Sequence, residues 1–133
     1  MTGETQLATL LRSLDPELAA PEVVFVSFAD AQYGDYADLQ PLAMVQEAEG
    51  MTLVVQKALA DQFQLAYDGV FQCITLKVHS SLQAVGLTAA VSRQLAQRGI
   101  SVNVLAGYYH DHIFVPAQQA DTALSALKAI ESF

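Results

Sequence analysis

Three histidines are the residues of this sequence with the clearest potential for chemistry. His110 and His112 are two positions apart, so their side chains would point to the same side of a β-strand, and His79 could lie nearby. A catalytic zinc ion typically takes three protein ligands and keeps one open position. One interpretation is therefore a small metal-dependent enzyme that uses His79, His110 and His112. The other is that His110 and His112 flank a hairpin and form only local hydrogen bonds.

Other polar residues offer weaker chemistry. Glu47 and Glu49 alternate onto one face and could form an acid–base pair, but neighbouring exposed carboxylates beside a turn are more often simply solvated. Ser80 and Ser81 fit a helix cap better than a nucleophile, because the sequence has no Gly-x-Ser-x-Gly elbow. Cys73 is the single cysteine, which excludes an internal disulfide and a Cys-rich zinc site. We therefore expect no catalytic residue, no bound metal and no cofactor.

The charge of the chain excludes several classes of partner. Six Lys and Arg stand against fourteen Asp and Glu in 133 residues, which gives a net charge of −8. All of this charge lies in residues 1–66, where ten acids face only Arg12 and Lys57. Without a basic cluster to neutralise phosphates, we expect neither nucleic acid nor an anionic membrane as a partner. The sequence shows no signal peptide or membrane span, so we expect a cytoplasmic protein.

The first half of the chain, residues 1–66, has the pattern of a small α+β unit. Leucine spacing, β-branched residues and turn residues predict a helix over residues 4–14, a strand over 22–28, a hairpin of 42–47 and 51–55, and a helix over 56–63. Gly50 should supply the positive φ of the hairpin turn. The last of these helices should bury Leu59 and Phe63. The intervening loop carries Tyr33 and Tyr36 and is expected to be the most mobile segment.

The second half, residues 67–133, is more regular. Its pattern predicts a strand over 70–78, a helix from Ser80 to Gly99, strands over 100–106 and 111–115, and a final helix that Pro116 opens. The first helix provides a crossover between strands, and the short link at Gly107 requires antiparallel neighbours. This β-α-β-β-α order predicts a ferredoxin-like α+β fold, with antiparallel sheets and helices packed on one face.

Two long motifs resemble the ACT-domain superfamily. They are FQCITLKVHSSLQAVGLTAAVS, from Phe71, and GISVNVLAGYYHDHIFVP, which ends at Pro116. The stretch EAEGMTLVV, from Glu47, is similar to the first half of one group within that superfamily. This group comprises small stand-alone bacterial proteins with two ACT-like halves, long catalogued as a domain of unknown function. The resemblance implies an acidic ACT-like half at 1–66 and an ACT domain at 67–133.

The resemblance also implies a site, because ACT domains typically bind an amino acid where two paired domains meet. The loop after the first strand of the C-terminal half would supply His79, Ser80, Ser81, Gly86 and Leu87. The strand edge opposite would supply Asn103, Ala106, Gly107, Tyr108, Tyr109 and Asp111. A helix start after Ser80 and Ser81 could bind the ligand carboxylate through free N–H groups, and Asp111 or Glu49 could pair with its ammonium group.

We therefore expect a non-catalytic regulatory protein that binds a small molecule of the amino-acid class and pairs into a homodimer. Two alternatives stay open. One is the metal-dependent enzyme of the three histidines. The other is a protein-interaction subunit that binds its partner through an exposed sheet edge. Two further features each have two interpretations. Gly107 with Tyr108 and Tyr109 forms either a plain turn or a wall of the ligand site. Gly86 either permits a close approach to the backbone or lets the helix pack against the sheet.

Overall fold

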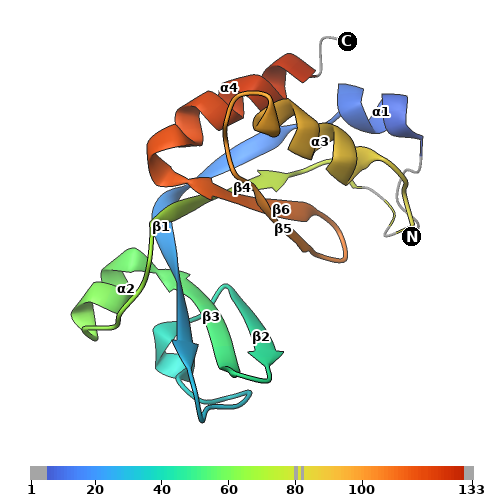
Figure 1. The fold of residues 1–133 in the computed structure, drawn as a ribbon. Coiled ribbons are helices and arrows are strands. Elements are labelled where there is room, and N and C mark those ends of the chain that lie inside the picture. The colour runs from blue at the N-terminus through green and yellow to red at the C-terminus, as the bar shows by residue number, and fades with distance from the viewer. Residues whose placement is uncertain (1–5, 80, 82, 131–133) are drawn as a thin grey trace. The chain divides into compact units, whose positions relative to one another are not determined.

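The computed structural model describes residues 6–79, 81 and 83–130 (Figure 1). The elements follow in this order: α1 (Leu7–Arg12), β1 (Pro16–Phe28), β2 (Ala43–Glu47), β3 (Gly50–Gln56), α2 (Lys57–Gln62), β4 (Phe71–Leu76), α3 (Leu87–Ala96), β5 (Asn103–Ala106), β6 (Asp111–Pro116) and α4 (Ala120–Ile130). Single 3₁₀ turns span Ala37–Leu39 and Ala117–Gln119. The strand order is β2-β3-β1-β4-β6-β5. The predicted antiparallel, ferredoxin-like α+β fold is confirmed, and none of the described helices is long and apolar enough to cross a membrane.

The chain packs as two units. One unit comprises residues 21–71, and the other comprises residues 1–20 together with residues 72–133. Strand β1 passes from one unit into the other between Ala20 and Pro21. The division by packing thus differs from a simple division along the sequence after residue 66, because Leu10 of α1 and Leu14 pack with the C-terminal segment.

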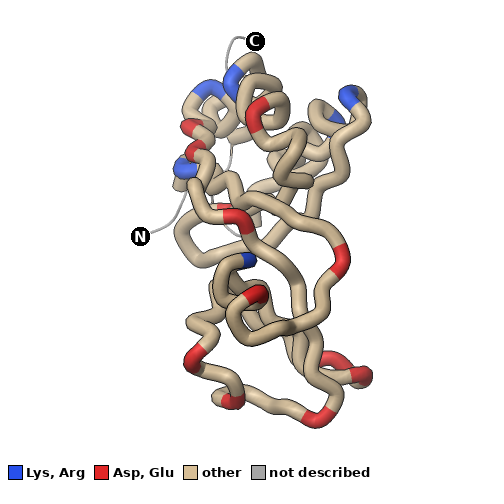
Figure 2. Tube along the Cα trace, turned by 90° about the vertical axis from the view of Figure 1, so that its left-hand side faces the viewer, with Lys and Arg blue, Asp and Glu red and all other residues tan. Residues whose placement is uncertain are grey.

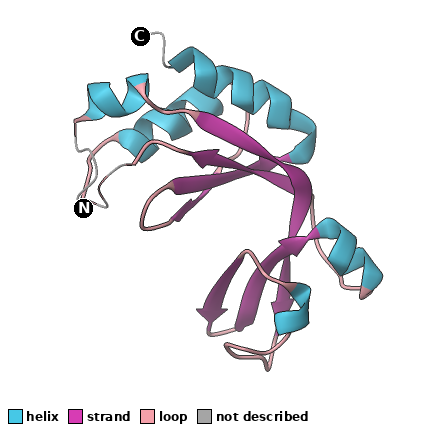
Figure 3. Cartoon of the chain, turned by 180° about the vertical axis from the view of Figure 1, so that it is seen from behind, coloured by secondary structure: helices cyan, strands magenta, loops and turns pink. Residues whose placement is uncertain are grey.

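The unit of residues 1–20 and 72–133 has its helices on one face of the strands (Figures 1 and 3). Ile74 of β4 and Ile113 of β6 are fully buried in the core beneath these helices. Helices α3 and α4 add the following apolar residues to this core: Leu87, Val91, Leu95, Ala123, Leu127 and Ile130. Leu10 of α1 and Leu14 are also fully buried there. Leu10 and Leu14 therefore complete the core of the C-terminal segment.

The unit of residues 21–71 is built on the antiparallel strands β2, β3 and β1. The register pairs Val24 with Val55 and Val26 with Leu53, and all four residues are buried in its core. Gly50 begins β3 with a φ of 146°. A Cβ atom at this position would lie 2.6 Å from the carbonyl oxygen of Phe28, so the close approach of β3 to the end of β1 requires glycine.

Four elements begin or pack differently from the prediction. Helix α3 begins at Leu87 and not after Ser80, because Gly86 precedes it with a φ of 97° that ends any earlier helical path. Strand β1 begins at Pro16 and not at residue 22, and β5 begins at Asn103. Phe63 is 44% exposed, since α2 ends at Gln62 and buries Ala60 instead. The periodicity of the sequence predicted that these elements exist. Their first residues and their buried side chains depend on contacts with other elements, which local periodicity does not reveal.

Candidate functional site

Aromatic rings join the loop after β4 to the turn between β5 and β6. The ring centroids of His79 and Tyr109 are 5.3 Å apart, and those of Tyr108 and Tyr109 are 5.0 Å apart in an edge-to-face arrangement. Tyr108 and Tyr109 are 66% and 58% exposed, so both rings are available to a ligand. The structure thus brings together three predicted site residues, which we call the His79–Tyr109 cluster: His79, Tyr108 and Tyr109.

Gly107 closes the turn that presents these tyrosines. Its N–H donates to the carbonyl oxygen of His110 at 2.9 Å. A Cβ atom on Gly107 would lie 2.8 Å from that same oxygen, so a side chain would force the turn open. Asp111 follows the turn, is half-buried, and pairs in register with Ala106. Burial raises the pKa of the Asp111 carboxyl, and the nearby His112 partly offsets this effect.

The predicted helix does not begin beside Ser81, which instead forms a turn with the residues that follow it. The hydroxyl of Ser81 accepts a hydrogen bond from the N–H of Gln83 at 3.1 Å, while Ser80 lies outside the described residues. The first free N–H groups of α3 follow Gly86 at Leu87, whose side chain is buried in the core. A Cβ atom on Gly86 would lie 3.1 Å from Cδ2 of Leu7, so α1 packs closely here. A carboxylate at this helix end would therefore bind beside Gly86 and not beside the serines.

The remaining predicted site residues are spread over several positions. The β5–β6 register puts Ala106 and Asp111 in one cross-strand pair, and puts Asn103 opposite Phe114. Because side chains alternate along a strand, Asn103 lies on the other face from Ala106. Glu49 is exposed in the β2–β3 turn, within the unit of residues 21–71. Asn103 and Glu49 stay predictions.

The three histidines have separate environments. Nδ1 of His112 lies 2.9 Å from the hydroxyl of Thr75 on β4, and burial, with a smaller effect of His110, lowers the pKa of His112. Nδ1 of His110 is buried without a hydrogen-bond partner among the described residues. His79 instead packs against Tyr109. Across residues 6–79, 81 and 83–130, no three His, Cys, Asp or Glu side chains are placed to hold a metal ion. The geometry gives the metal-enzyme alternative no support.

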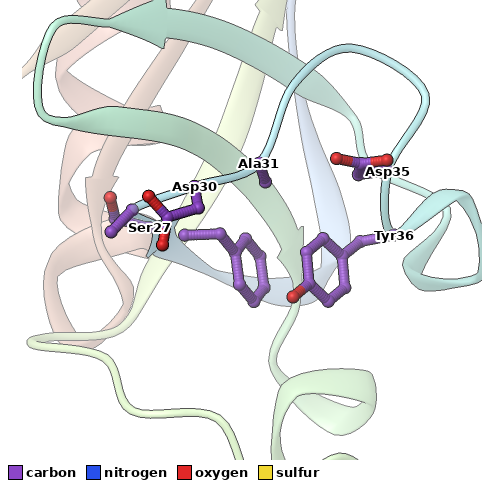
Figure 4. Close-up of a pocket in the computed structure, with 7 residues that line it drawn as sticks. Ser27, Asp30, Ala31, Asp35 and Tyr36 are labelled. Carbon is purple, nitrogen blue, oxygen red and sulfur yellow. The ribbon is translucent and has the colours of Figure 1, made fainter.

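A second feature was missed by the sequence prediction. An open hollow of about 630 Å³ lies in the unit of residues 21–71, where β1 ends (Figure 4). Residues 27–31, Asp35 and Tyr36 line it. The ring of Tyr36 stacks on that of Phe28, with centroids 3.8 Å apart and an interplanar angle of 13°. The sequence signal is the combination of aspartates and tyrosines in this loop, which predicts only mobility.

Two family models match the chain, and both describe an ACT domain. One matches residues 2–72 and the other residues 70–129. Together they span both halves of the sequence, and the first alone covers more than half of it. None of the curated proteins matches the chain closely enough to count as a relative.

Solved structures share the fold of this chain. A protein of unknown function from Vibrio cholerae, described as a possible transport protein, is 48% identical, with a TM-score of 0.86 over 94% of this chain and 95% of that one. A protein from Agrobacterium tumefaciens shares 16% identity at a TM-score of 0.67, covering 87% of each chain. The regulatory subunit of aspartate kinase from Thermus thermophilus shares 12% at 0.65, over 89% of this chain and 97% of that one. The chain belongs to the ACT domain family, whose members are regulatory modules that bind small molecules.

Proposed function

We propose that this protein binds a free amino acid and acts as a non-catalytic regulatory module. The observation that carries the proposal is the His79–Tyr109 cluster, in which the loop after β4 meets the β5–β6 turn. Exposed aromatic rings offer an apolar wall to a ligand side chain, and the tight turn at Gly107 holds that wall in place.

The charged ends of an amino acid have complementary groups in the same unit. The half-buried Asp111 lies two residues after Tyr109 and would pair with the ligand ammonium group. This pairing would stabilise the ionised carboxyl, whose pKa burial raises in the free protein. The free N–H groups at the start of α3, next to Gly86, would donate hydrogen bonds to the carboxylate. Pairing of two copies, a contribution of Glu49 and a cytoplasmic location stay predictions.

A thermal-unfolding screen of the twenty amino acids tests the proposal. An amino acid present at 100 times its dissociation constant would add about 2.7 kcal/mol to the free energy of unfolding, which is a readily measured shift in Tm. We expect one amino acid, or a small group with related side chains, to stabilise the protein. Equal Tm values across all twenty, each tested up to its solubility limit, would contradict the proposal.

The same screen in the presence of a chelator addresses the metal-enzyme alternative. Because no three metal-ligating side chains come together among the described residues, we expect EDTA to leave both Tm and amino-acid binding unchanged. A large loss of stability in EDTA, restored by zinc, would instead favour a metal-dependent protein.

A further inference from the structure

We propose that the hollow lined by residues 27–31, Asp35 and Tyr36 is a second binding site, for an organic cation with two ammonium groups joined by an alkyl chain. This site is in the unit of residues 21–71, whereas the proposed amino-acid site is built on residues of the other unit. Figure 4 shows Ser27 and Asp30 toward one side of the hollow and Asp35 with Tyr36 toward the other. Two separated carboxylates beside an exposed aromatic ring suit a ligand that is cationic at both ends and apolar in the middle.

The carboxylates of the hollow lack a counter-charge in their own unit. Residues 21–71 contain eight acids and one base, Lys57, so their net charge is one minus eight, or −7. Lys57 is already paired with Asp61, at 2.8 Å between Nζ and Oδ2. Asp30 makes no hydrogen bond or ion pair within the part of the chain that the structure describes. Figure 2 shows Lys and Arg gathered mainly in the part that carries both termini. A cation for the hollow must therefore come from outside this unit.

Hydrogen bonds within the loop hold the second carboxylate in position before any ligand binds. Oδ2 of Asp35 accepts a hydrogen bond from the N–H of Gln32 at 3.0 Å. The N–H of Asp35 in turn donates to the carbonyl oxygen of Gln32 at 2.9 Å. The side chain of Gln46, on β2, donates to the carbonyl oxygen of Ala31 at 3.3 Å. Leu39, a few residues further along, is 2% exposed and anchors the loop in the core. A wall fixed in this way loses little conformational entropy when a ligand binds.

Tyr36 supplies the apolar surface for the middle of the ligand. One face of its ring stacks on Phe28, yet the residue is still 46% exposed. An alkylammonium group packs well on such a ring, because the methylene groups cover apolar surface and the cation is attracted to the ring face. An inorganic divalent cation fits less well, since calcium takes six to eight oxygen ligands and no three-carboxylate group exists among the described residues.

The test uses the full chain and three small probes of similar length: 1,4-diaminobutane, 1-aminobutane and 1,4-butanediol. Binding is followed by backbone amide NMR shifts at constant ionic strength. We expect diaminobutane to bind more tightly than aminobutane, the diol to cause no shift, and the perturbed amides to lie in residues 27–36. Shifts that spread evenly over the acidic residues of the chain, or equal effects of the diamine and the diol, would overturn the proposal.

Matched variants separate a built site from simple charge attraction. Asp30→Asn and Asp35→Asn should each weaken diamine binding by about twofold to fivefold, as for exposed ion pairs. Asparagine at position 35 can still accept the N–H of Gln32, so the loop is preserved. Asp38→Asn removes the same charge from an exposed residue of the same loop that does not line the hollow, and should leave the affinity unchanged. Equal losses in all three variants would contradict a specific site.

The ring and the independence of the two sites are tested in the same way. Tyr36→Asn removes the ring but suits the left-handed backbone at φ 63°, and should weaken diamine binding by about twofold to fivefold. Tyr109→Ala changes the proposed amino-acid site and should leave diamine binding unchanged. Unaltered affinity in Tyr36→Asn would overturn the assigned role of the ring, whatever the outcome of the amino-acid screen.

Discussion

Position 50 requires glycine for two physical reasons, backbone conformation and lack of space, and their effects on stability can be measured separately. Its φ of 146° is one that side chains rarely adopt, and a Cβ atom would lie 2.6 Å from the carbonyl oxygen of Phe28. Gly34 has a φ of 96° with open space around it. The two glycines therefore share the backbone requirement, but only Gly50 is also confined by its neighbours.

We expect Gly50→Ala to lower the free energy of unfolding clearly more than Gly34→Ala does. Backbone strain should cost each variant about 1–2 kcal/mol, and the overlap with the end of β1 should add about 1–3 kcal/mol in Gly50→Ala alone. Urea unfolding monitored by circular dichroism gives both values. Equal losses in the two variants would show that the close approach of β3 to β1 is not as described.

The environment of His112 predicts a pH dependence of stability. Burial and the nearby His110 lower its pKa below the ordinary value of 6.5. The unfolded chain therefore binds a proton more readily than the folded chain does. The stabilising contribution is fully present above pH 6.5 and is lost as the pH falls through this value toward the pKa of the folded state.

His112→Asn should reduce this pH dependence. Asparagine keeps a polar group near the hydroxyl of Thr75 but does not titrate, so we expect the wild-type protein to lose more stability than the variant between pH 7.5 and pH 5.5. Asp111 is present in both proteins, and its raised pKa acts on both in the same direction. Urea unfolding at the two pH values measures the difference, and parallel losses would contradict the account of His112.

Among the elements, α1 shows how distant segments of the sequence share one core. Leu10 is fully buried with residues of β4, α3, β6 and α4, although it lies more than sixty residues away from them in sequence. Leu7, on the same short helix, is 37% exposed. The helix has only six residues, so tertiary packing and not intrinsic propensity must stabilise it.

Leu10→Ala should therefore destabilise the protein by about 2–5 kcal/mol, as expected for a leucine removed from a packed core. Leu7→Ala, one helical turn earlier, should cost clearly less because its side chain is already partly in water. Both values come from chemical denaturation of the full chain. A negligible effect of Leu10→Ala would contradict the assignment of residues 1–20 to the core of the C-terminal segment.

Local sequence patterns predicted most of the secondary structure. The leucine stripe, the EVVFVSF strand and the hairpin at Gly50 were found because side-chain periodicity and turn chemistry act over a few residues. The predicted start of α3 is too early, since Ser80 and Gln83 have the spacing of a capping box, whereas the helix begins only at Leu87, after Gly86. A capping motif indicates that a helix could begin at a position, but it does not show that the helix begins there in the folded protein.

The candidate site was only partly predictable for a similar reason. Gly107, Tyr108 and Tyr109 form one short turn, so their proximity could be expected from sequence alone. The packing of His79 on Tyr109 joins two segments thirty residues apart. Only the resemblance to ACT domains predicted that these two segments contribute to one site. The hollow beside Tyr36 left no motif, because its shape results from the path of the loop and its hydrogen bonds to Gln46 and within the loop.

At the scale of the whole molecule, the two packing units differ strongly in net charge. Residues 21–71 carry −7 of the total −8, while residues 1–20 and 72–133 together carry −1. The proposed amino-acid site uses the nearly neutral unit, which suits a zwitterionic ligand without net charge. The proposed diamine site uses the acidic unit. The two proposals therefore predict ligands of different net charge for different parts of one chain.

Calorimetric titration of the stabilising amino acid into the wild type and Tyr109→Ala tests the central claim most directly. Tyr33→Ala is the matched control, because Tyr33 is 85% exposed and lies outside both the His79–Tyr109 cluster and the lining of the hollow. We predict that Tyr109→Ala weakens binding about tenfold or more, corresponding to about 1.4 kcal/mol, while Tyr33→Ala binds as the wild type does. Equal affinity in the wild type and Tyr109→Ala would contradict the claim that amino acids bind at the His79–Tyr109 cluster.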